Sequence, residues 1–74
     1  MFTIKVIDRR NGQPVEGKKV QIFFDGFFRG HTGEQYTSSD GESHFSEDNG
    51  HGEVFVGRER VYRGDIGGRV VVYI

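Results

Sequence analysis

The chain has 74 residues, a formal net charge of −1 at pH 7 and no Cys, Trp, Leu or Ala. This length accommodates one small domain, so residues 1–74 are treated as a single unit. The absence of Cys excludes disulfides, zinc thiolate sites and cysteine nucleophiles. The nearly balanced charge makes nucleic acid an unexpected partner, and no run approaches the roughly 20 apolar residues of a transmembrane helix. We expect no membrane contact. No signal peptide is visible, so the compartment stays unknown, with the cytoplasm favoured if the chain is complete.

The apolar residues of the chain are those that favour strands. They comprise nine Val, five Ile, seven Phe, three Tyr and one Met. Side chains that are β-branched or aromatic are enriched in strands. Leu and Ala, the apolar residues that most favour helices, are missing. The composition therefore predicts an all-β protein.

Two strands are predicted in the first third of the chain, with a turn between them. Residues 2–8 and 18–24 alternate along their length, which is the pattern of half-buried strands. Between them, Asn11-Gly12 favours a tight turn, and Pro14 cannot lie inside a strand ladder. Asp25-Gly26 stands between two Phe-Phe pairs and predicts a hairpin turn at this dipeptide. The side chains expected to face inward are Phe2, Ile4, Val6, Val20, Ile22 and Phe24.

The middle of the chain is predicted to alternate between short strands and polar loops. Residues 29–33 are polar and rich in glycine, which is typical of a loop. Short strands are expected at residues 34–38 and 43–45, with a turn at residues 39–42 that contains an Asp-Gly dipeptide. This part of the chain therefore contributes two short strands.

The last third of the chain contains the most apolar segment. Residues 46–52 are predicted to form a mobile loop and residues 53–57 a strand. Residues 58–63 are ambiguous between strand and loop, and the glycines of residues 64–68 predict a turn. Residues 69–74 form the most apolar strand, which we expect to be central in its sheet or covered on both faces.

About seven short strands with regularly spaced turn signals indicate a sandwich or a small barrel. We expect a small antiparallel β-sandwich of about seven strands with an immunoglobulin-like arrangement, and the alternative is a small SH3-like or OB-like barrel. A chain this short has little surplus of apolar burial over the entropy of ordering. Self-association is therefore a further expectation.

Two segments of the chain, taken together, resemble a known family. Residues 11–20 read Asn-Gly-Gln-Pro-Val-Glu-Gly-Lys-Lys-Val, and residues 37–45 read Thr-Ser-Ser-Asp-Gly-Glu-Ser-His-Phe. In this order they resemble the carboxypeptidase regulatory-like and transthyretin-like β-sandwich modules, with a similarity that covers residues 2–45. The resemblance implies a transthyretin-like sandwich and an accessory or binding role, although a fold shared by many functions assigns none of them.

One enzyme family has a related fold, the transthyretin-like hydrolases of 5-hydroxyisourate. Residues 6–14 resemble the first motif of these enzymes, and Tyr62-Arg63-Gly64-Asp65 resembles their final motif. The catalytic His of the family corresponds to Lys5 in this chain, so no catalytic residue carries over. We expect no enzymatic activity, and a degenerate hydrolase is the remote alternative.

The three histidines do not form a recognisable metal motif. His31, His44 and His51 are separated by 13 and 7 residues, and structural zinc sites space their ligands differently. We expect all three at the surface, with His44 facing solvent. The sequence predicts neither a metal ion nor a cofactor.

Aromatic residues surround the predicted hairpin turn and form the candidate binding site. Alternation allows about two of the rings of Phe23, Phe24, Phe27 and Phe28 to face inward, which leaves two outward. Adjacent exposed rings form an apolar patch of the kind that marks interaction sites, and Arg29 is placed to stack on a ring or on a partner. The predicted binding residues are Phe23, Phe27, Phe28 and Arg29. The alternative is that residues 29–33 fold back and cover the rings.

The sequence therefore favours a non-catalytic accessory or protein-interaction module. The expected partner is another protein or a second copy of the chain in a homodimer, bound through the aromatic hairpin or an edge strand. The alternative is a small barrel that binds single-stranded nucleic acid with aromatic rings and arginines. Four arginines gather in the last third of the chain, namely Arg58, Arg60, Arg63 and Arg69.

Overall fold

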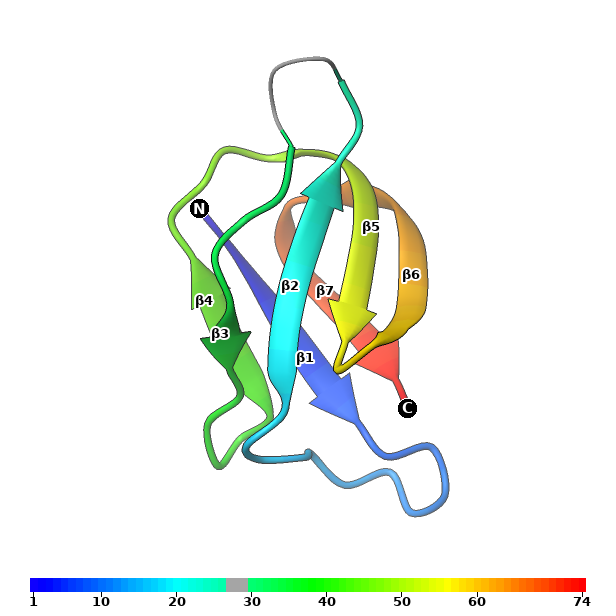
Figure 1. Cartoon of the computed structure of the whole chain (residues 1–74). Helices are drawn as coiled ribbons and strands as arrows, with labels where there is room; N and C mark the ends of the chain where they lie inside the picture. Colours follow the sequence, from blue (N-terminus) through cyan, green and yellow to red (C-terminus); the bar gives the residue numbers. More distant parts are fainter. Residues whose placement is uncertain (27–29) are drawn as a thin grey trace.

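The computed structural model describes residues 1–26 and 30–74, and these residues form seven strands and no helix (Figure 1). The strands are β1 (Phe2–Ile7), β2 (Lys19–Phe24), β3 (Gln35–Tyr36), β4 (Glu42–Phe45), β5 (Gly50–Val56), β6 (Glu59–Ile66) and β7 (Gly68–Tyr73). The described residues thus include no helix that is long and apolar enough to cross a membrane. The prediction of an all-β protein is confirmed.

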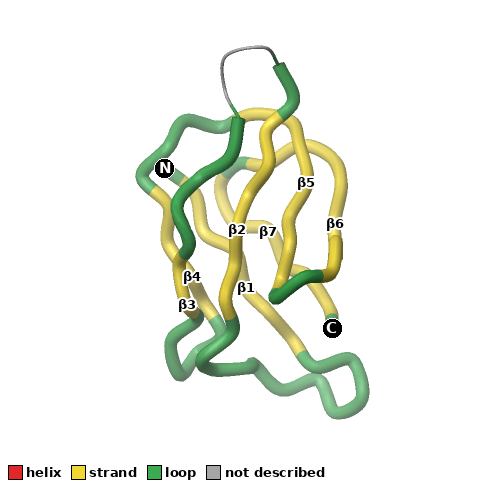
Figure 2. Tube along the Cα trace, in the orientation of Figure 1, coloured by secondary structure: helices red, strands yellow, loops and turns green. Residues whose placement is uncertain are grey.

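The strands form two sheets that pack face to face (Figures 1 and 2). Sheet A has the strand order β4-β1-β7, and sheet B has the order β3-β2-β5-β6. The chain passes from one layer to the other after β1, β3, β4 and β6. Two separate sheets confirm the predicted small β-sandwich of about seven strands and set the barrel alternative aside.

One strand pair departs from the predicted antiparallel arrangement. β1 runs parallel to β7, with Phe2 opposite Gly68 and Ile7 opposite Tyr73. The other ladders among the described strands are antiparallel. Parallel neighbours require a long crossover, and here the crossover contains all of sheet B together with β4. Local sequence patterns do not reveal a pairing between the two ends of a chain.

The core lies between the two layers and contains the side chains that were predicted to face inward. From sheet A, Phe2 stacks on Phe45 with ring centroids 5.2 Å apart, and from sheet B, Phe24 meets Phe2 edge-on at 6.0 Å. Aromatic pairs of this kind contribute about 1 kcal/mol each beyond their buried area. The remaining buried members of the core are Ile4, Val6, Val20, Ile22, Val54, Val56, Ile66, Val70 and Val72.

The most apolar strand, β7, lies at an edge of sheet A and has one exposed face, so the prediction of a strand that is central or covered on both faces was wrong. It pairs with β1 alone. Val71 and Tyr73 on its outer face are 38% and 51% exposed, whereas Val70 and Val72 are buried. An apolar run indicates a strand but says nothing of how many neighbours that strand has. The strand of sheet A that is paired on both sides is β1.

Glycines that were predicted to form turns lie inside strands instead. β6 continues to Ile66 and β7 begins at Gly68, so Gly67 alone separates strands of different sheets. β5 likewise begins at Gly50, inside the predicted loop of residues 46–52. The physical reason is close approach: a Cβ on Gly52 would lie 2.3 Å from the carbonyl oxygen of Phe23, and one on Gly64 would lie 3.0 Å from the hydroxyl of Tyr62.

Candidate functional site

Phe23 is the one predicted binding residue that the structure describes; Phe27, Phe28 and Arg29 lie outside the described residues. Alternation along β2 turns the ring of Phe23 outward, and 39% of the residue is exposed. Past the end of β2, the carbonyl of Gly30 accepts a hydrogen bond of 2.7 Å from the Phe24 amide. The chain therefore reverses direction between Phe24 and Gly30, and the residues that follow the predicted Asp25-Gly26 turn lie outside the described part of the chain.

Phe23 is the centre of an aromatic cluster on the outer face of sheet B, which we define as Phe23, His31 and Phe55. The ring of Phe55, on β5, meets Phe23 edge-on at a centroid distance of 5.1 Å. The imidazole of His31, which bridges to Phe23 in the return segment, lies 5.4 Å from the same ring. Sequence analysis identified Phe23 but missed its two neighbours, because cross-strand contacts depend on register.

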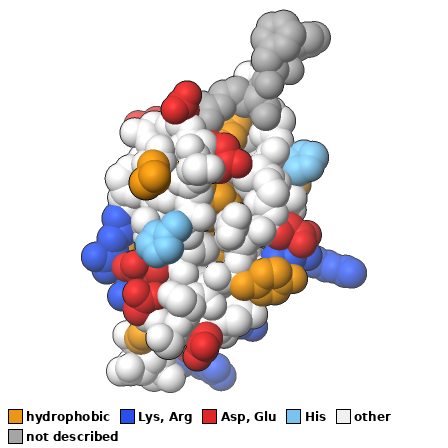
Figure 3. Space-filling view, turned by 90° about the vertical axis from the view of Figure 1, so that its left-hand side faces the viewer, with side chains coloured by type: hydrophobic (Ala, Val, Ile, Leu, Met, Phe, Trp, Pro, Cys, Tyr) orange, Lys and Arg blue, Asp and Glu red, His pale blue; other side chains and the backbone are white. Residues whose placement is uncertain are grey.

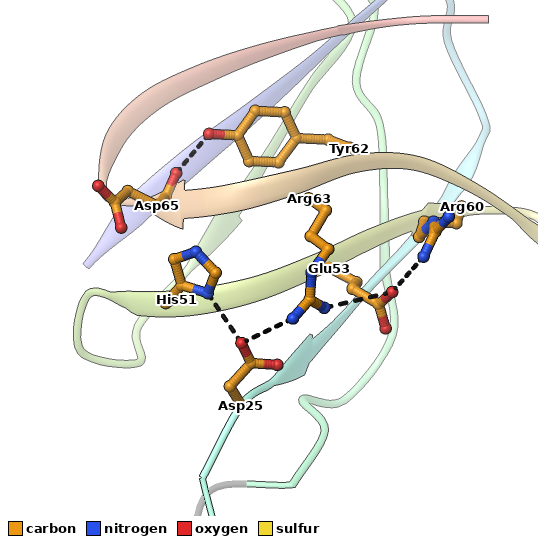
Figure 4. A network of polar contacts seen from close by, with 7 residues as sticks. All are labelled: Asp25, His51, Glu53, Arg60, Tyr62, Arg63 and Asp65. Atoms are coloured by element: carbon orange, nitrogen blue, oxygen red, sulfur yellow. Dashed lines mark hydrogen bonds and ion pairs between the residues drawn. The ribbon is translucent and has the colours of Figure 1, made fainter.

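A polar network lies beside the aromatic cluster and joins the residue that follows β2 to β5 and β6 (Figure 4). The carboxylate of Asp25 accepts a hydrogen bond from His51 Nδ1 at 2.8 Å and another from Arg63 at 3.2 Å. Arg63 also lies 3.5 Å from the carboxylate of Glu53, which accepts a hydrogen bond of 2.7 Å from Arg60. We call these five residues the sheet B network.

The network places two carboxylates against two guanidinium groups, so its fixed charges cancel. The hydrogen bond from His51 is the main cause that lowers the pKa of Asp25 below its ordinary value of 3.8, and the charge of Arg63 adds to the effect. All of these groups are partly exposed to solvent, where individual ion pairs contribute little to stability. Their clearer effect is that the face around the aromatic rings is polar yet carries no net fixed charge.

The arginines that suggested nucleic acid do not form one patch. Arg60 and Arg63 are paired with carboxylates on sheet B. Arg69 belongs to sheet A, where its guanidinium lies 3.6 Å from the carboxylate of Glu42. On the β3–β4 side of the molecule, basic and acidic side chains also lie next to one another (Figure 3). Among the described residues, the basic side chains are therefore distributed over both layers.

The three histidines make separate contacts. His31 packs on Phe23, and His51 binds Asp25. His44 faces solvent from sheet A, as predicted, and its Nδ1 is hydrogen-bonded to the hydroxyl of Thr3 at 2.8 Å. No group of three or more His, Asp and Glu side chains that could hold a metal ion occurs within residues 1–26 and 30–74.

The two segments that carry the family resemblance lie against each other. The amide of Thr37 donates a hydrogen bond to the carbonyl of Lys18 at 2.9 Å, and the amide of Gly17 donates to the carbonyl of Thr37 at 2.9 Å. The buried hydroxyl of Thr37 donates to the carbonyl of Val15 at 2.7 Å and accepts from the amide of Lys18 at 2.9 Å. These hydrogen bonds therefore tie the segment that leads into β2 to the residue that follows β3.

A groove that sequence analysis missed lies at the end of the sandwich opposite the loop after β2. It consists of two adjoining hollows of about 470 and 480 Å³ that share Arg9, Lys18 and Ile74. We call it the end groove. The sequence does contain a signal for this groove. Two pairs of basic residues, Arg9-Arg10 and Lys18-Lys19, stand on either side of the loop between β1 and β2.

Comparisons with known proteins identify no relative: no family model, no curated protein and no solved structure matches the chain. The class of the protein therefore rests on its fold, a small β-sandwich of one three-stranded and one four-stranded sheet.

Proposed function

We propose that the chain is a non-catalytic protein-interaction module and that its contact surface is the aromatic cluster on sheet B. The observation that carries the proposal is the exposure of Phe23, a large apolar side chain that is 39% exposed and packs edge-on against Phe55. Protein interfaces are rich in aromatic residues at their centre and have polar, solvated rims. The cluster would supply such a centre, and the sheet B network would supply the rim.

The neutrality of the rim favours a protein over a polyanion as the partner. Binding of single-stranded nucleic acid combines aromatic platforms with a positively charged groove. Beside the aromatic cluster, the guanidinium groups of Arg60 and Arg63 already face the carboxylates of Glu53 and Asp25. A phosphate would have to compete with these carboxylates at both positions.

A second copy of the chain is the partner to test first. A two-fold contact brings the same patch of both copies together, so the patch must complement itself. The sheet B network carries both signs of charge within one face, which permits opposite charges to meet across a two-fold axis. The exposed ring of Phe23 would then pack against the same surface of the other copy.

The test is light scattering coupled to size-exclusion chromatography over a dilution series. We expect the average mass of the wild type to rise toward a dimer with concentration and that of Phe23→Ser to stay monomeric. Val71→Ser is the matched control, because Val71 is 38% exposed but belongs to sheet A; this variant should associate like the wild type.

Circular dichroism on the same samples distinguishes a lost contact from a lost fold. Equal association of Phe23→Ser and the wild type would refute the aromatic cluster as the contact surface, and unfolding of Phe23→Ser would assign its ring to the core. A wild type that stays monomeric at every concentration would exclude a second copy as the partner.

A further inference from the structure

The end groove lies where the two sheets separate on the β6–β7 side. Gly67 alone connects β6 to β7, which holds the sheets together at one end of these strands. The first hollow of the groove lies at the other end, between Arg60 and Val61 at the start of β6 and Tyr73 and Ile74 at the end of β7. Figure 1 shows this end of the molecule below the strands, beside the C-terminus and away from the loop that follows β2.

The floor of the groove is apolar and continuous with the core. Val56, which is 7% exposed, belongs to the core and lines the first hollow. Val61 and Ile74 pack against the core and remain partly exposed in the same hollow. Val15 also packs against the core, is partly exposed and lines the second hollow. An apolar group placed here would cover side chains that the protein itself leaves half-covered.

Two cations without a carboxylate partner lie where the hollows meet. Arg10 and Arg60 also line the groove, but Arg10 is paired with Asp8 at 2.9 Å and Arg60 with Glu53 at 2.7 Å. By contrast, within the described part of the chain the ammonium group of Lys18 has no hydrogen bond or ion pair.

The guanidinium group of Arg9 is similarly available. Among the described residues, its one hydrogen bond or ion pair is a hydrogen bond of 3.4 Å to the carbonyl of Tyr73. A guanidinium has five N–H donors in a planar fork, so several remain for a ligand. Glu59 is the one acidic side chain that lines the first hollow, and among the described residues it forms no ion pair with Arg9 or Lys18.

We propose that the end groove binds small carboxylates that carry an apolar body, such as aryl-substituted short-chain acids. The apolar body would cover Val56, Val61 and Ile74, and the carboxylate would lie between Lys18 and Arg9. The first hollow, at about 470 Å³, is within the range of roughly 300–1,000 Å³ that is typical of small-molecule sites. An inorganic anion would leave the apolar floor uncovered, and a neutral apolar molecule would leave both cations unpaired.

This site shares Arg60 with the rim of the interaction surface proposed above, but the residues that carry the two proposals differ. Lys18 immediately precedes β2, whereas Phe23 lies near the opposite end of that strand. The aromatic cluster contributes no lining residue to either hollow. The two proposals can therefore fail separately.

The test is a titration of the uniformly ¹⁵N-labelled chain with 4-phenylbutyrate, followed by amide chemical shifts. The control ligand is 4-phenylbutanol, which has the same apolar body and no charge. We expect 4-phenylbutyrate to shift the amides of Arg9, Lys18 and residues 57–61 and to bind more tightly than the alcohol. Partly exposed charge pairs are weak, so Lys18→Gln should raise Kd about threefold, and Arg9→Gln with Lys18→Gln about tenfold.

Lys5→Gln is the matched control variant. It removes one positive charge, as Lys18→Gln does, but from β1 and from a residue that lines neither hollow. The Kd of this variant for 4-phenylbutyrate should equal that of the wild type. Both Arg9 and Lys18 are exposed, so their substitution should leave the fold intact, and the spectrum of each variant reports this directly. Equal affinities for the acid and the alcohol would overturn the proposal. Amide shifts confined to other surfaces would also overturn it, as would the absence of shifts at the highest concentration of 4-phenylbutyrate.

Discussion

His51 Nδ1 lies 2.8 Å from the carboxylate of Asp25, and this hydrogen bond ties the start of β5 to the residue that follows β2. The backbone makes the same connection, because the amide of Asp25 donates to the carbonyl of His51 at 2.8 Å. Arg63, on β6, adds a third strand to the contact. The two residues are 26 positions apart in the chain, so the contact depends entirely on the pairing of the strands.

Replacement of Asp25 by Asn should destabilise the fold at neutral pH and much less in acid. The folded chain lowers the pKa of Asp25 below 3.8, chiefly through the hydrogen bond from His51. A lowered carboxyl pKa stabilises the folded state at pH values above the unfolded pKa, and this contribution is lost as the pH falls through the folded pKa. Urea denaturation of both proteins at about pH 6 and about pH 2 measures the difference.

The control for this prediction is Asp65→Asn. The carboxylate of Asp65, which lies opposite His51 in the β5–β6 ladder, has no hydrogen bond or ion pair among the described residues. Its replacement should change stability little at either pH. The same loss of stability in Asp25→Asn at both pH values would contradict the assigned role of the carboxylate.

Gly41→Ala should be clearly more destabilising than Gly12→Ala. Both glycines have positive φ, +78° and +72°, which costs an L-residue about 1–2 kcal/mol. A Cβ at Gly12 would meet nothing within 4 Å, whereas a Cβ at Gly41 would lie 2.7 Å from the carbonyl oxygen of Val6 and 2.8 Å from Cβ of Pro14. Overpacking of this kind adds about 1–3 kcal/mol. Denaturation midpoints report both costs, and equal values for the two variants would refute the close approach at Gly41.

Thr37→Val should cost about 1–3 kcal/mol even though the two side chains have the same shape. The buried hydroxyl of Thr37 satisfies the carbonyl of Val15 and the amide of Lys18, and both lose their partner in the variant. Thr37→Ser keeps the hydroxyl and should cost about 0.8 kcal/mol for the lost methyl group. Equilibrium unfolding compares the two variants; a Val variant as stable as the Ser variant would show that the hydroxyl does not bridge these segments in solution.

The parts of the fold that sequence analysis predicted are those in which burial is periodic along a single strand. Phe2, Ile4 and Val6 are buried on one face of β1, and Val20 and Ile22 on one face of β2. Alternation with period two follows from strand geometry alone, so it is visible without knowledge of the partner strand. The outward orientation of Phe23 was predictable for the same reason.

The parts that could not be predicted depend on which strands meet. The position of β7 at an edge and its parallel pairing with β1 are set by packing across the whole chain. Gly52 was predicted in a loop and Gly64 in a turn, but they lie opposite each other in the β5–β6 ladder. A Cβ on Gly52 would meet the backbone of β2, and one on Gly64 would meet the ring of Tyr62. Register also decides that His31 and Phe55 join Phe23, so the sequence indicated one member of the aromatic cluster.

The aromatic cluster should behave as a coupled unit in a double-mutant cycle. The rings of Phe23 and Phe55 meet edge-on at 5.1 Å with an interplanar angle of 69°, a geometry that contributes about 0.5–1.5 kcal/mol beyond area burial. Unfolding free energies of Phe23→Ala, Phe55→Ala and the double variant should therefore give a coupling energy of about 1 kcal/mol.

A second cycle that pairs Phe23→Ala with Tyr36→Ala is the control for this coupling. Tyr36 is exposed on β3 in the same sheet and makes no ring contact with Phe23, so its coupling energy should be near zero. Equal coupling in the two cycles would show that Phe55 does not hold the ring of Phe23 in place. A surface that binds a partner through Phe23 depends on that restraint, because a ring already ordered in the free protein loses less entropy on binding.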